Sequence, residues 1–201
     1  FQQLCQRRIK HEPIAYIRGE KEFFGLHLYI DNRALDPRAD TETLLEWALE
    51  LLPAGDKAAV LDLGTGSGAV ALGLKSQRPA WQITATDASQ DALAVAKINR
   101  RQFQLIVSNP PYIPEADPHL DALKAEPLSA LASGSDGLDD IRHIIAAAPA
   151  HLHAGGCLLL EHGWQQADAV CTLLQQAGFS QVRSRRDLAG HQRCSGGRWE
   201  A

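Results

Sequence analysis

Apolar positions recur along the chain with the periods of buried strands and of helix faces. Short apolar runs typical of buried strands lie at 58–63, 81–86, 103–108 and 156–161. Helix-like patterns accompany them at 44–51, 69–74, 137–150 and 165–177. Further strand-like stretches follow at 181–186 and 193–199. Because strands and helices alternate, we predict an α/β fold with a mostly parallel sheet flanked by helices.

The N-terminal part of the chain has a different pattern. Residues 1–10 read as the end of a helix whose last turn carries basic side chains. Residues 12–30 read as a connector and a hairpin with a partly alternating apolar surface. The next helix has a candidate N-cap in Asp40 or Thr41. Arg38 stands just before it, held by a proline, and is a candidate for reaching a ligand or a carboxylate.

A glycine-rich turn follows the predicted strand at 58–63. It reads Leu61-Asp62-Leu63-Gly64-Thr65-Gly66-Ser67-Gly68 and leads directly into an apolar helix. Glycine lets a ligand approach the backbone, and a helix N-terminus favours a carboxylate or phosphate. Asp87 ends the next strand, where an acidic residue typically accepts hydrogen bonds from ribose hydroxyls. These features together indicate a cofactor site.

The glycine spacing also bears on which cofactor is bound. G-x-G-x-G preceded by Asp62 resembles the first motif of S-adenosylmethionine-dependent methyltransferases, whereas dinucleotide folds favour G-x-G-x-x-G. Asp62 can meet the amino-acid end of this cofactor, or it can tie down the glycine turn. The candidate cofactor-binding residues are Asp62, Gly64, Thr65, Gly66, Ser67, Gly68, Asp87 and Asn109.

The tetrapeptide Asn109-Pro110-Pro111-Tyr112 follows the predicted strand at 103–108. Two consecutive prolines donate no backbone N–H, so the strand must end there. The Asn109 side-chain oxygen and the Pro110 carbonyl can accept hydrogen bonds from a planar NH2 group, and the Tyr112 ring can pack against its face. This set suits chemistry on an amide or a nucleobase amine. A Pro-Pro turn is also an ordinary structural feature, and the motif gains weight from the cofactor site upstream.

The chain between Asp87 and Asn109 is too short for the predicted sheet. It has room for one helix at 91–99 before the strand at 103–108 begins. A doubly wound sheet of this type needs another strand and helix there. The absence of methionine from the sequence points the same way. We therefore expect an interruption near 100–102, at which residues of the protein are missing from the printed sequence.

Composition and charge narrow the classes of function. The chain has 201 residues, 45% hydrophobic and 22% charged, which is enough for one sizeable core. A net charge of -4 argues against a protein that binds nucleic acid mainly through its phosphates. No apolar run approaches the roughly 20 residues that a membrane span needs, so we expect no membrane partner. The four cysteines show no metal-ligand spacing, so we expect reduced thiols in a cytosolic protein and no metal site.

Several short motifs together carry a resemblance to a known family. They are Glu12-Pro13-Ile14, Phe23, Pro37-Arg38-x-Asp40-Thr41-Glu42, Asp62 to Gly68, Ser108 to Ile113, Glu126-Pro127-Leu128-x-Ala130-Leu131 and Leu160-Glu161-His162-Gly163. In this order they resemble the peptide chain release factor glutamine methyltransferase family (HemK or PrmC) over nearly the whole chain. Asp36 departs from the family pattern, which usually has an apolar residue there, and the loop before Glu126 is shortened.

The resemblance implies a fold and a domain organisation. The fold would be a Rossmann-like class I methyltransferase, with a mostly parallel seven-stranded sheet flanked by helices and a short hairpin connector before it. Residues 1–36 would be the tail of an N-terminal helical domain plus the connector. Residues 37–201 would be the S-adenosylmethionine-dependent methyltransferase domain.

The resemblance also implies an activity. Members of the family methylate the side-chain amide nitrogen of the glutamine in the Gly-Gly-Gln motif of class-1 release factors, using S-adenosylmethionine. Asn109, Pro110 and Tyr112 would be catalytic. The substrate would contact Asn109, Pro110, Pro111, Tyr112 and Arg38. The expected partner is therefore a class-1 release factor, met by a cytoplasmic enzyme that acts as a monomer.

Three other functions fit parts of the pattern. A nucleic-acid amino-methyltransferase acting on adenine or cytosine shares the Asn-Pro-Pro-Tyr type of loop, but the acidic charge and the segment 37–42 argue against it. A ribosomal-protein glutamine methyltransferase is closer, and Asp40-Thr41-Glu42 is the main reason to rank it lower. A non-catalytic nucleotide-binding module is disfavoured because Asn109 and the glycine turn are both intact.

Overall fold

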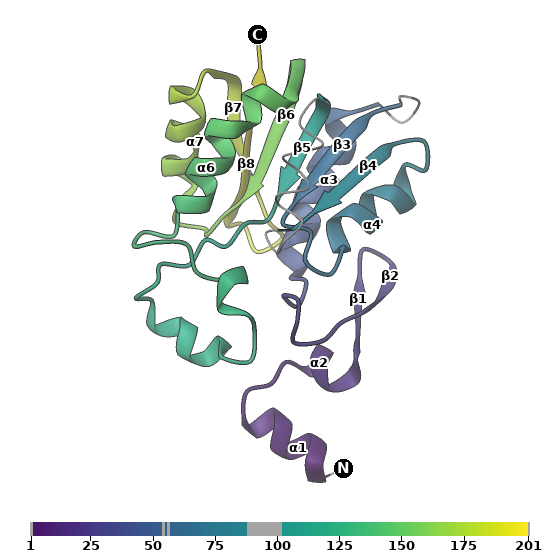
Figure 1. The fold of residues 1–201 in the computed structure, drawn as a ribbon, viewed down its shortest axis with the longest axis vertical. Helices are drawn as coiled ribbons and strands as arrows, with labels where there is room; N and C mark the ends of the chain where they lie inside the picture. The colour runs from purple at the N-terminus through teal and green to yellow at the C-terminus, as the bar shows by residue number, and fades with distance from the viewer. Residues whose placement is uncertain (1, 54, 56, 88–101, 201) are drawn as a thin grey trace.

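A six-stranded sheet forms the centre of the protein in the computed structural model, which describes residues 2–53, 55, 57–87 and 102–200 (Figure 1). Its strand order is β4-β3-β5-β6-β8-β7. The first four strands in this order run parallel, and β8 is antiparallel to both β6 and β7. The strands are β3 (Ala59–Leu63), β4 (Gln82–Thr86), β5 (Phe103–Ser108), β6 (Leu152–Glu161), β7 (Phe179–Arg186) and β8 (Gln192–Trp199).

Helices cover both faces of this sheet, which is why its central strands are apolar runs without alternation. The α-helices that pack on it are α3 (Glu42–Leu51), α4 (Ala69–Gln77), α6 (Asp139–Ala147) and α7 (Ala167–Gln176). On one face, α3 and α4 contribute Leu44, Trp47 and Leu74 to a core shared with β3, β5 and β6. On the other face, α6 and α7 contribute Ile141 and Val170. Each face therefore has its own hydrophobic core.

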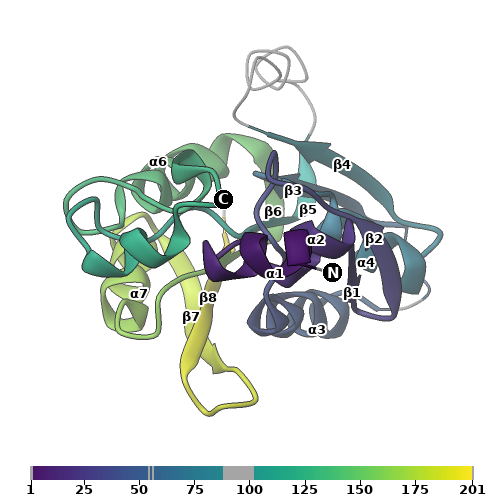
Figure 2. The ribbon, with the colours of Figure 1, turned by 90° about the horizontal axis from the view of Figure 1, so that it is seen from below.

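The N-terminal segment lies outside the sheet. Figure 2 shows α1 (Gln2–Ile9) and α2 (Ile14–Arg18) near the viewer when the molecule is seen from below. An antiparallel hairpin of β1 (Glu20–Phe23) and β2 (Leu26–Tyr29) follows them. The Tyr16 hydroxyl donates to the Ala34 carbonyl at 2.6 Å and ties α2 to the chain that leads into the sheet. The helix predicted at the N-terminus and the predicted hairpin are confirmed by α1 and by β1 with β2, and α2 is an additional short helix.

The segment that joins β5 to α6 is long and faces the N-terminal segment across the lower part of Figure 1. It contains two 3-10 turns, η2 (Pro118–Leu123) and η3 (Leu128–Ala130). A bridge between Ile113 and Ala132 closes it into a loop. The last 3-10 turn, η4 (Ala148–His151), follows α6 and leads into β6.

Two expectations about the fold differ from what the structure describes. The sheet has six strands among the described residues, where seven were predicted. The predicted helix at 91–99 lies outside those residues, and so does most of the predicted interruption near 100–102, which stays a prediction.

The predicted helix caps were wrong. The 3-10 turn η1 (Ala39–Thr41) precedes α3, and the Thr41 backbone is already helical, with no side-chain cap at that helix end. A side-chain cap needs an extended backbone at the N-cap residue, so Thr41 cannot serve. Asp40 instead pairs with Arg193 of β8 at 3.0 Å. Thr41 accepts a hydrogen bond from Asn109 at 3.1 Å, so both polar side chains serve long-range contacts.

The sheet tolerates no side chain at Gly196 of β8. A Cβ there would lie 2.5 Å from the Leu158 carbonyl oxygen and 2.4 Å from Leu159 Cδ2. We expect Gly196→Ala to lower the free energy of unfolding by about 1–3 kcal/mol, because strand β6 must shift to admit the methyl group. Urea unfolding measures this. Gly55→Ala is the matched control, because nothing lies within 4 Å of its Cβ position; equal losses in both variants would contradict the packing argument.

Candidate active site at the carboxyl ends of β3, β4 and β5

Three parallel strands bring the two predicted motifs to the same edge of the sheet. Leu63 at the end of β3 pairs with Thr86 of β4 on one side and with Ser108 of β5 on the other. The Ser108 hydroxyl donates to the Leu63 carbonyl at 2.7 Å. The glycine turn after β3 and the Asn109 loop after β5 therefore start next to each other. Ligands of open α/β sheets bind at this edge, beyond the carboxyl ends of the strands.

The glycine turn has the left-handed backbone that its residues predict. Gly64, Gly66 and Gly68 have φ values of 72°, 52° and 82°. Nothing lies within 4 Å of the positions that Cβ atoms would take at Gly64 and Gly66. A side chain would thus fill open space next to the backbone, which is the space that an approaching ligand needs.

Asp62 holds this turn in place. It is 1% exposed, and its Oδ2 atom accepts hydrogen bonds from the Thr65 hydroxyl at 2.7 Å and from the Ala71 backbone N–H at 3.1 Å. Burial raises the pKa of Asp62 to about 6, although both hydrogen bonds act to lower it. Of the two roles that the sequence left open for Asp62, these contacts support the tying of the turn.

Asp87 reaches the turn from the end of β4. Its Oδ2 atom accepts the Gly66 backbone N–H at 2.8 Å, and the Thr65 N–H donates to the Thr86 carbonyl at 2.8 Å. Asp87 is partly exposed, so it can also accept hydrogen bonds from ligand hydroxyls. Two acidic residues from neighbouring strands thereby bracket the glycine turn.

Asn109 is oriented by a residue that is distant in sequence. Its Nδ2 atom donates to the Thr41 hydroxyl oxygen at 3.1 Å. With Nδ2 held this way, the Oδ1 atom of the same amide is on the opposite side and can accept hydrogen bonds. Among the described residues, no hydrogen bond to that atom occurs.

Tyr112 turns its hydroxyl toward the end of β6. The hydroxyl donates to Glu161 Oε1 at 3.3 Å, and burial, reinforced by the Glu161 charge, raises the pKa of Tyr112. Glu161 is 0% exposed. Burial raises its pKa to about 7, against the lowering effects of the Thr41 hydroxyl, the Arg193 charge and the Tyr112 hydroxyl.

Arg38 reaches a carboxylate, as one of its predicted roles required. Its guanidinium pairs with Glu126 Oε1 at 2.6 Å and lies 3.7 Å from Asp36 Oδ2. Asp36 is buried and also pairs with Lys21, so the residue that departs from the family pattern is compensated by two cations. The Arg38 to Glu126 pair links the chain before α3 to the loop after β5.

The Asn-Pro-Pro-Tyr loop lines a cavity of about 120 Å³. Arg38 and Asn109 lie on its wall together with apolar side chains from three segments. The lining residues are Leu35, Arg38, Asn109, Pro110, Pro111, Tyr112, Ile113, Leu123, Ala130 and Leu131. The substrate candidates that the sequence predicted, Arg38 included, therefore surround one space.

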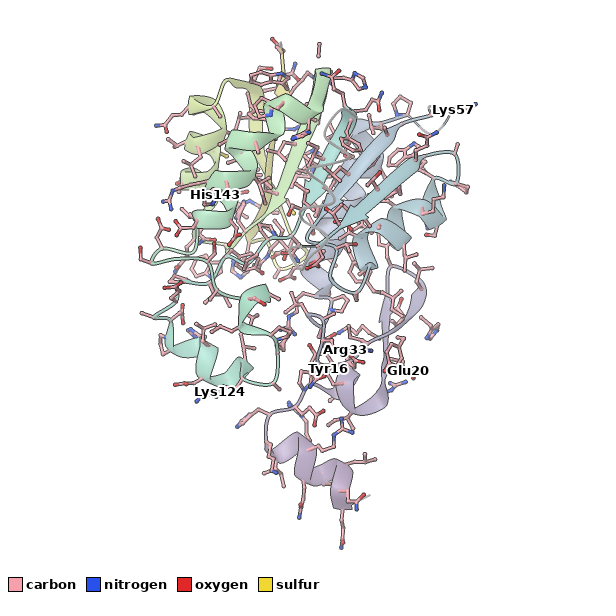
Figure 3. All side chains as sticks on the ribbon, viewed as in Figure 1. Tyr16, Glu20, Arg33, Lys57, Lys124 and His143 are labelled. Carbon is pink, nitrogen blue, oxygen red and sulfur yellow. The ribbon has the colours of Figure 1, made fainter. Side chains whose placement is uncertain are left out.

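A larger cleft of about 500 Å³ adjoins this cavity and shares Arg38 and Leu123 with it. It lies between the N-terminal segment and the loop after β5. Figure 3 shows Tyr16 in the first of these segments and Lys124 in the second, both below the carboxyl ends of the parallel strands. The cleft carries charged side chains of both signs. At Arg38 and Leu123 it meets the cavity that Asn109 lines.

Sequence patterns did not single out several residues of this site. Glu161 was part of a recognised motif but received no role, although an acidic residue at the end of a buried strand is a usable signal. The residue types around Thr41 predict a helix cap and not its contact with Asn109. Arg193, which pairs with Asp40 at 3.0 Å and with Asp187 at 3.1 Å, had no signal at all. The pairing of Glu126 with Arg38 could likewise not be predicted from the sequence.

Neither a metal-binding cluster nor a membrane-spanning helix occurs in the part of the chain that the structure describes. No group of three or more His, Cys, Asp or Glu side chains there could hold a metal ion. Within the same residues, no helix is both long and apolar enough to cross a membrane.

Comparisons with known proteins show which family the chain resembles. Residues 39–183 match the family model of the methyltransferase small domain. The chain is 50% identical to a release factor glutamine methyltransferase of Coxiella burnetii, over 92% of this chain and 74% of that protein. It is 48% identical to one of Pseudomonas aeruginosa, over 99% of this chain and 80% of that protein. The latter alignment spans 222 positions, more than the 201 residues of this chain, so that relative has residues without a counterpart here.

Solved structures give the same result. The crystal structure of a release factor-specific protein-(glutamine-N5) methyltransferase from Alicyclobacillus acidocaldarius matches with a TM-score of 0.60 and 31% identity, over 82% of this chain and 94% of that one. A methyltransferase from Pyrococcus furiosus matches with a TM-score of 0.63 at 17% identity, over the whole of both chains. The second likeness concerns the fold alone.

Ionisation of Asp62 should destabilise the free protein. Because its folded-state pKa of about 6 lies above its usual value, the stability associated with protonated Asp62 is full at low pH and is lost as the pH rises through 6. We expect Asp62→Asn to gain stability relative to the wild type between pH 4 and pH 7, by up to about 3 kcal/mol. Urea unfolding at both pH values measures the difference.

Glu115→Gln controls for the loss of one negative charge, since Glu115 is exposed and distant from the glycine turn in sequence. A stability difference between Asp62→Asn and the wild type that stays constant from pH 4 to pH 7 would show that Asp62 is not desolvated in solution.

Proposed function

The chain belongs to the release factor glutamine methyltransferase family, and we propose that it transfers a methyl group from S-adenosylmethionine to the glutamine side-chain amide in the Gly-Gly-Gln motif of class-1 release factors. One observation carries the proposal for this chain. The Asn109 amide is held by Thr41 at the wall of a cavity, at the sheet edge where the glycine turn also begins. Methyl transfer requires the methyl donor and the planar amide to bind in neighbouring sites, and this arrangement provides them.

The residues present fit the cofactor. The open space beside Gly64 and Gly66 admits a ligand to the backbone of the turn, and Asp87 can accept hydrogen bonds from ribose hydroxyls. We assign cofactor binding to Asp62, Gly64, Thr65, Gly66, Ser67, Gly68, Asp87 and Asn109, with Asp62 acting by holding the turn. When bound, S-adenosylmethionine supplies a methyl group on a positively charged sulfur.

The difficulty of the reaction lies in the substrate. An amide nitrogen is a poor nucleophile because its lone pair is delocalised into the carbonyl group. Accepting both amide hydrogens favours electron density on the nitrogen, and we assign the two acceptors to Asn109 Oδ1 and the Pro110 carbonyl. Hydrogen bonds that strengthen as charge develops contribute roughly 1.5–3 kcal/mol each.

The remaining residues of the loop give alignment. Pro111 stiffens it and Tyr112 lines the cavity, so that the amide is presented in line with the methyl group. Methylation leaves the nitrogen strongly acidic until it loses a proton, which water can accept. The scheme needs no general base from the protein.

Arg38 and the adjoining cleft support a polypeptide substrate. The cleft of about 500 Å³ leads away from the cavity at Arg38, between the N-terminal segment and the loop after β5. Such a cleft can take the polypeptide on either side of a glutamine side chain that enters the cavity. We therefore assign substrate contacts to Arg38 as well as to the Asn-Pro-Pro-Tyr loop.

The proposal includes a domain division, an oligomeric state and a cellular location. We propose that residues 1–36 are the tail of an N-terminal helical domain plus the hairpin connector and that residues 37–201 form the S-adenosylmethionine-dependent methyltransferase domain. The enzyme then acts as a monomer in the cytoplasm, where release factors meet the ribosome.

Labelling tests the substrate. Purified protein with methyl-labelled S-adenosylmethionine should label a class-1 release factor, and a release factor whose Gly-Gly-Gln glutamine is replaced by alanine should stay unlabelled, because no other amide is presented. Counting the label in the separated protein measures this. Methyl transfer to DNA, RNA or a ribosomal protein in place of the release factor would overturn the assignment.

Truncating Asn109 tests the amide contact. We expect Asn109→Ala to lose most of its turnover, about 10- to 100-fold or more, because one hydrogen-bond acceptor for the substrate amide is removed. Steady-state rates and cofactor binding by calorimetry are measured together. The variant should still bind cofactor, and an unchanged turnover would contradict the proposed role.

A further inference from the structure

Gln166 lies between β6 and α7 and has no part in the mechanism so far, yet both polar atoms of its side-chain amide are in use. Its Oε1 atom accepts the Gly163 backbone N–H at 2.8 Å. Its Nε2 atom donates to the Tyr112 carbonyl at 3.0 Å and to the Asp136 carbonyl at 3.2 Å. An amide NH2 group has two hydrogens, so each of them has a partner.

These three contacts fix the orientation of the Gln166 amide. A flipped amide would place its NH2 group against the Gly163 N–H and its oxygen against two carbonyl oxygens. Neither arrangement can form a hydrogen bond, because donors would face a donor and an acceptor would face acceptors. The side chain is half-buried, so water does not fully replace the lost bonds. Gln166 therefore keeps one orientation and one set of partners.

The turn that carries Gln166 is itself fastened to β8. The His162 backbone N–H donates to the Arg193 carbonyl at 3.0 Å, and the His162 ring Nε2 atom lies 2.7 Å from the Ser195 hydroxyl. The ring Nδ1 atom lies 2.9 Å from the Gly163 carbonyl, which also accepts the Gln166 backbone N–H at 2.8 Å. The amide of Gln166 thus starts from a part of the protein that the sheet holds in place.

The two carbonyls that Gln166 holds lie at the beginning and at the end of the loop between β5 and α6. Between them, the loop is closed by its own hydrogen bonds, from the Ile113 N–H to the Leu131 carbonyl at 2.9 Å and from the Glu115 N–H to the Gly134 carbonyl at 2.9 Å. Both partners of these bonds belong to the loop, so the bonds shape it without fixing it against the sheet. Gln166 joins both of its ends to the turn after β6.

The backbone packs directly on this contact at Gly137. The residue is buried, and its φ is 76°. A Cβ atom at Gly137 would lie 2.2 Å from the Tyr112 carbonyl oxygen and 2.8 Å from Gln166 Nε2. The end of the loop therefore approaches the Gln166 amide as closely as only a glycine permits.

The Tyr112 carbonyl lies next to the proposed amide acceptors. Asn109 directly follows β5, and two prolines with fixed φ separate it from Tyr112, so few torsions of this stretch are free. With β5 at one end and Gln166 at the other, the Pro110 carbonyl lies between two held points. A displacement of about 1 Å at a reacting group can lower a rate by roughly 100-fold.

We propose that Gln166 is a positioning residue: it holds both ends of the loop after β5 against the sheet and thereby sets where Asn109 Oδ1 and the Pro110 carbonyl meet the substrate amide. This inference rests on the function proposed above, although it holds for any substrate that bears an NH2 group.

Replacing Gln166 by glutamate tests the two donated bonds. The shape is kept and the Gly163 N–H still has an acceptor, but an ionised carboxylate cannot donate to the two carbonyls. We expect Gln166→Glu to lower kcat about 10- to 100-fold and to change the KM for the protein substrate far less. Gln165→Glu adds the same charge at the exposed neighbouring side chain, which makes no hydrogen bond among the described residues, and should keep wild-type kcat.

Gln166→Asn provides a second test that does not depend on the folding of the glutamate variant. Its amide is one methylene shorter and cannot reach the Tyr112 carbonyl. Residue 166 is the N-cap of α7, where asparagine is favourable, so urea unfolding should show a wild-type free energy. We expect kcat to fall as in Gln166→Glu, with Gln165→Asn as the matched control. Wild-type kcat in Gln166→Asn would overturn the proposal.

A double-variant cycle provides a readout that a purely structural role would not change. Asn109→Ala removes one of the two acceptors that the loop positions. If Gln166 acts through these acceptors, Gln166→Asn should lower kcat by a smaller factor in Asn109→Ala than in the wild type. The same factor in both backgrounds would show that Gln166 acts independently of Asn109 and would contradict the proposal.

The outcome is distinguishable from failure of the proposed function. If the wild type labels a different NH2-bearing substrate and leaves release factors unlabelled, the proposed function fails. The same variants are then compared on the substrate that is labelled, and their kcat values still decide whether Gln166 positions the loop.

Discussion

The parallel pairing of β3 with β5 is the constraint on which the candidate site depends. Leu63 lies opposite Ser108, and the Ser108 hydroxyl donates to the Leu63 carbonyl across 45 positions of sequence. Because parallel strands end at the same edge of the sheet, the glycine turn after β3 and the proline-stiffened loop after β5 become neighbours although they are far apart in sequence. The cofactor turn and the amide-binding loop are thus held at a spacing that the sheet sets.

Buried and partly buried polar groups form a second layer behind this edge. Thr41 comes from the turn before α3, Asn109 and Tyr112 follow β5, Glu161 ends β6 and Arg193 lies on β8. Each of them must find a partner, because an unpaired polar group in a desolvated interior costs more than a hydrogen bond returns. The Thr41 and Glu161 contacts therefore fasten the turn before α3 and the end of β6 to the loop that carries Asn109.

Sequence patterns predicted the parts of the fold that depend on neighbouring residues. The apolar runs at 59–63 and 103–108 are strands, the glycines after β3 have positive φ, and residues 20–29 form the hairpin. These features follow from local rules, namely the burial of apolar runs and the backbone freedom of glycine. The cap predicted for α3 failed because the same residue types that cap helices also serve in long-range polar contacts.

Residue chemistry along the chain determined the motifs: an Asn-Pro-Pro-Tyr loop that can accept two amide hydrogens, a glycine turn open to a ligand and an acidic residue, Asp87, after the next strand. Only the tertiary structure decided that Asn109 bonds to Thr41, that Tyr112 bonds to Glu161 and that Arg38 pairs with Glu126 across 88 positions. The physical reason is the distance along the chain over which each kind of interaction acts. Backbone conformation and burial depend on a few neighbours in sequence, whereas the partner of a buried polar group depends on which strands and turns the completed sheet places beside it.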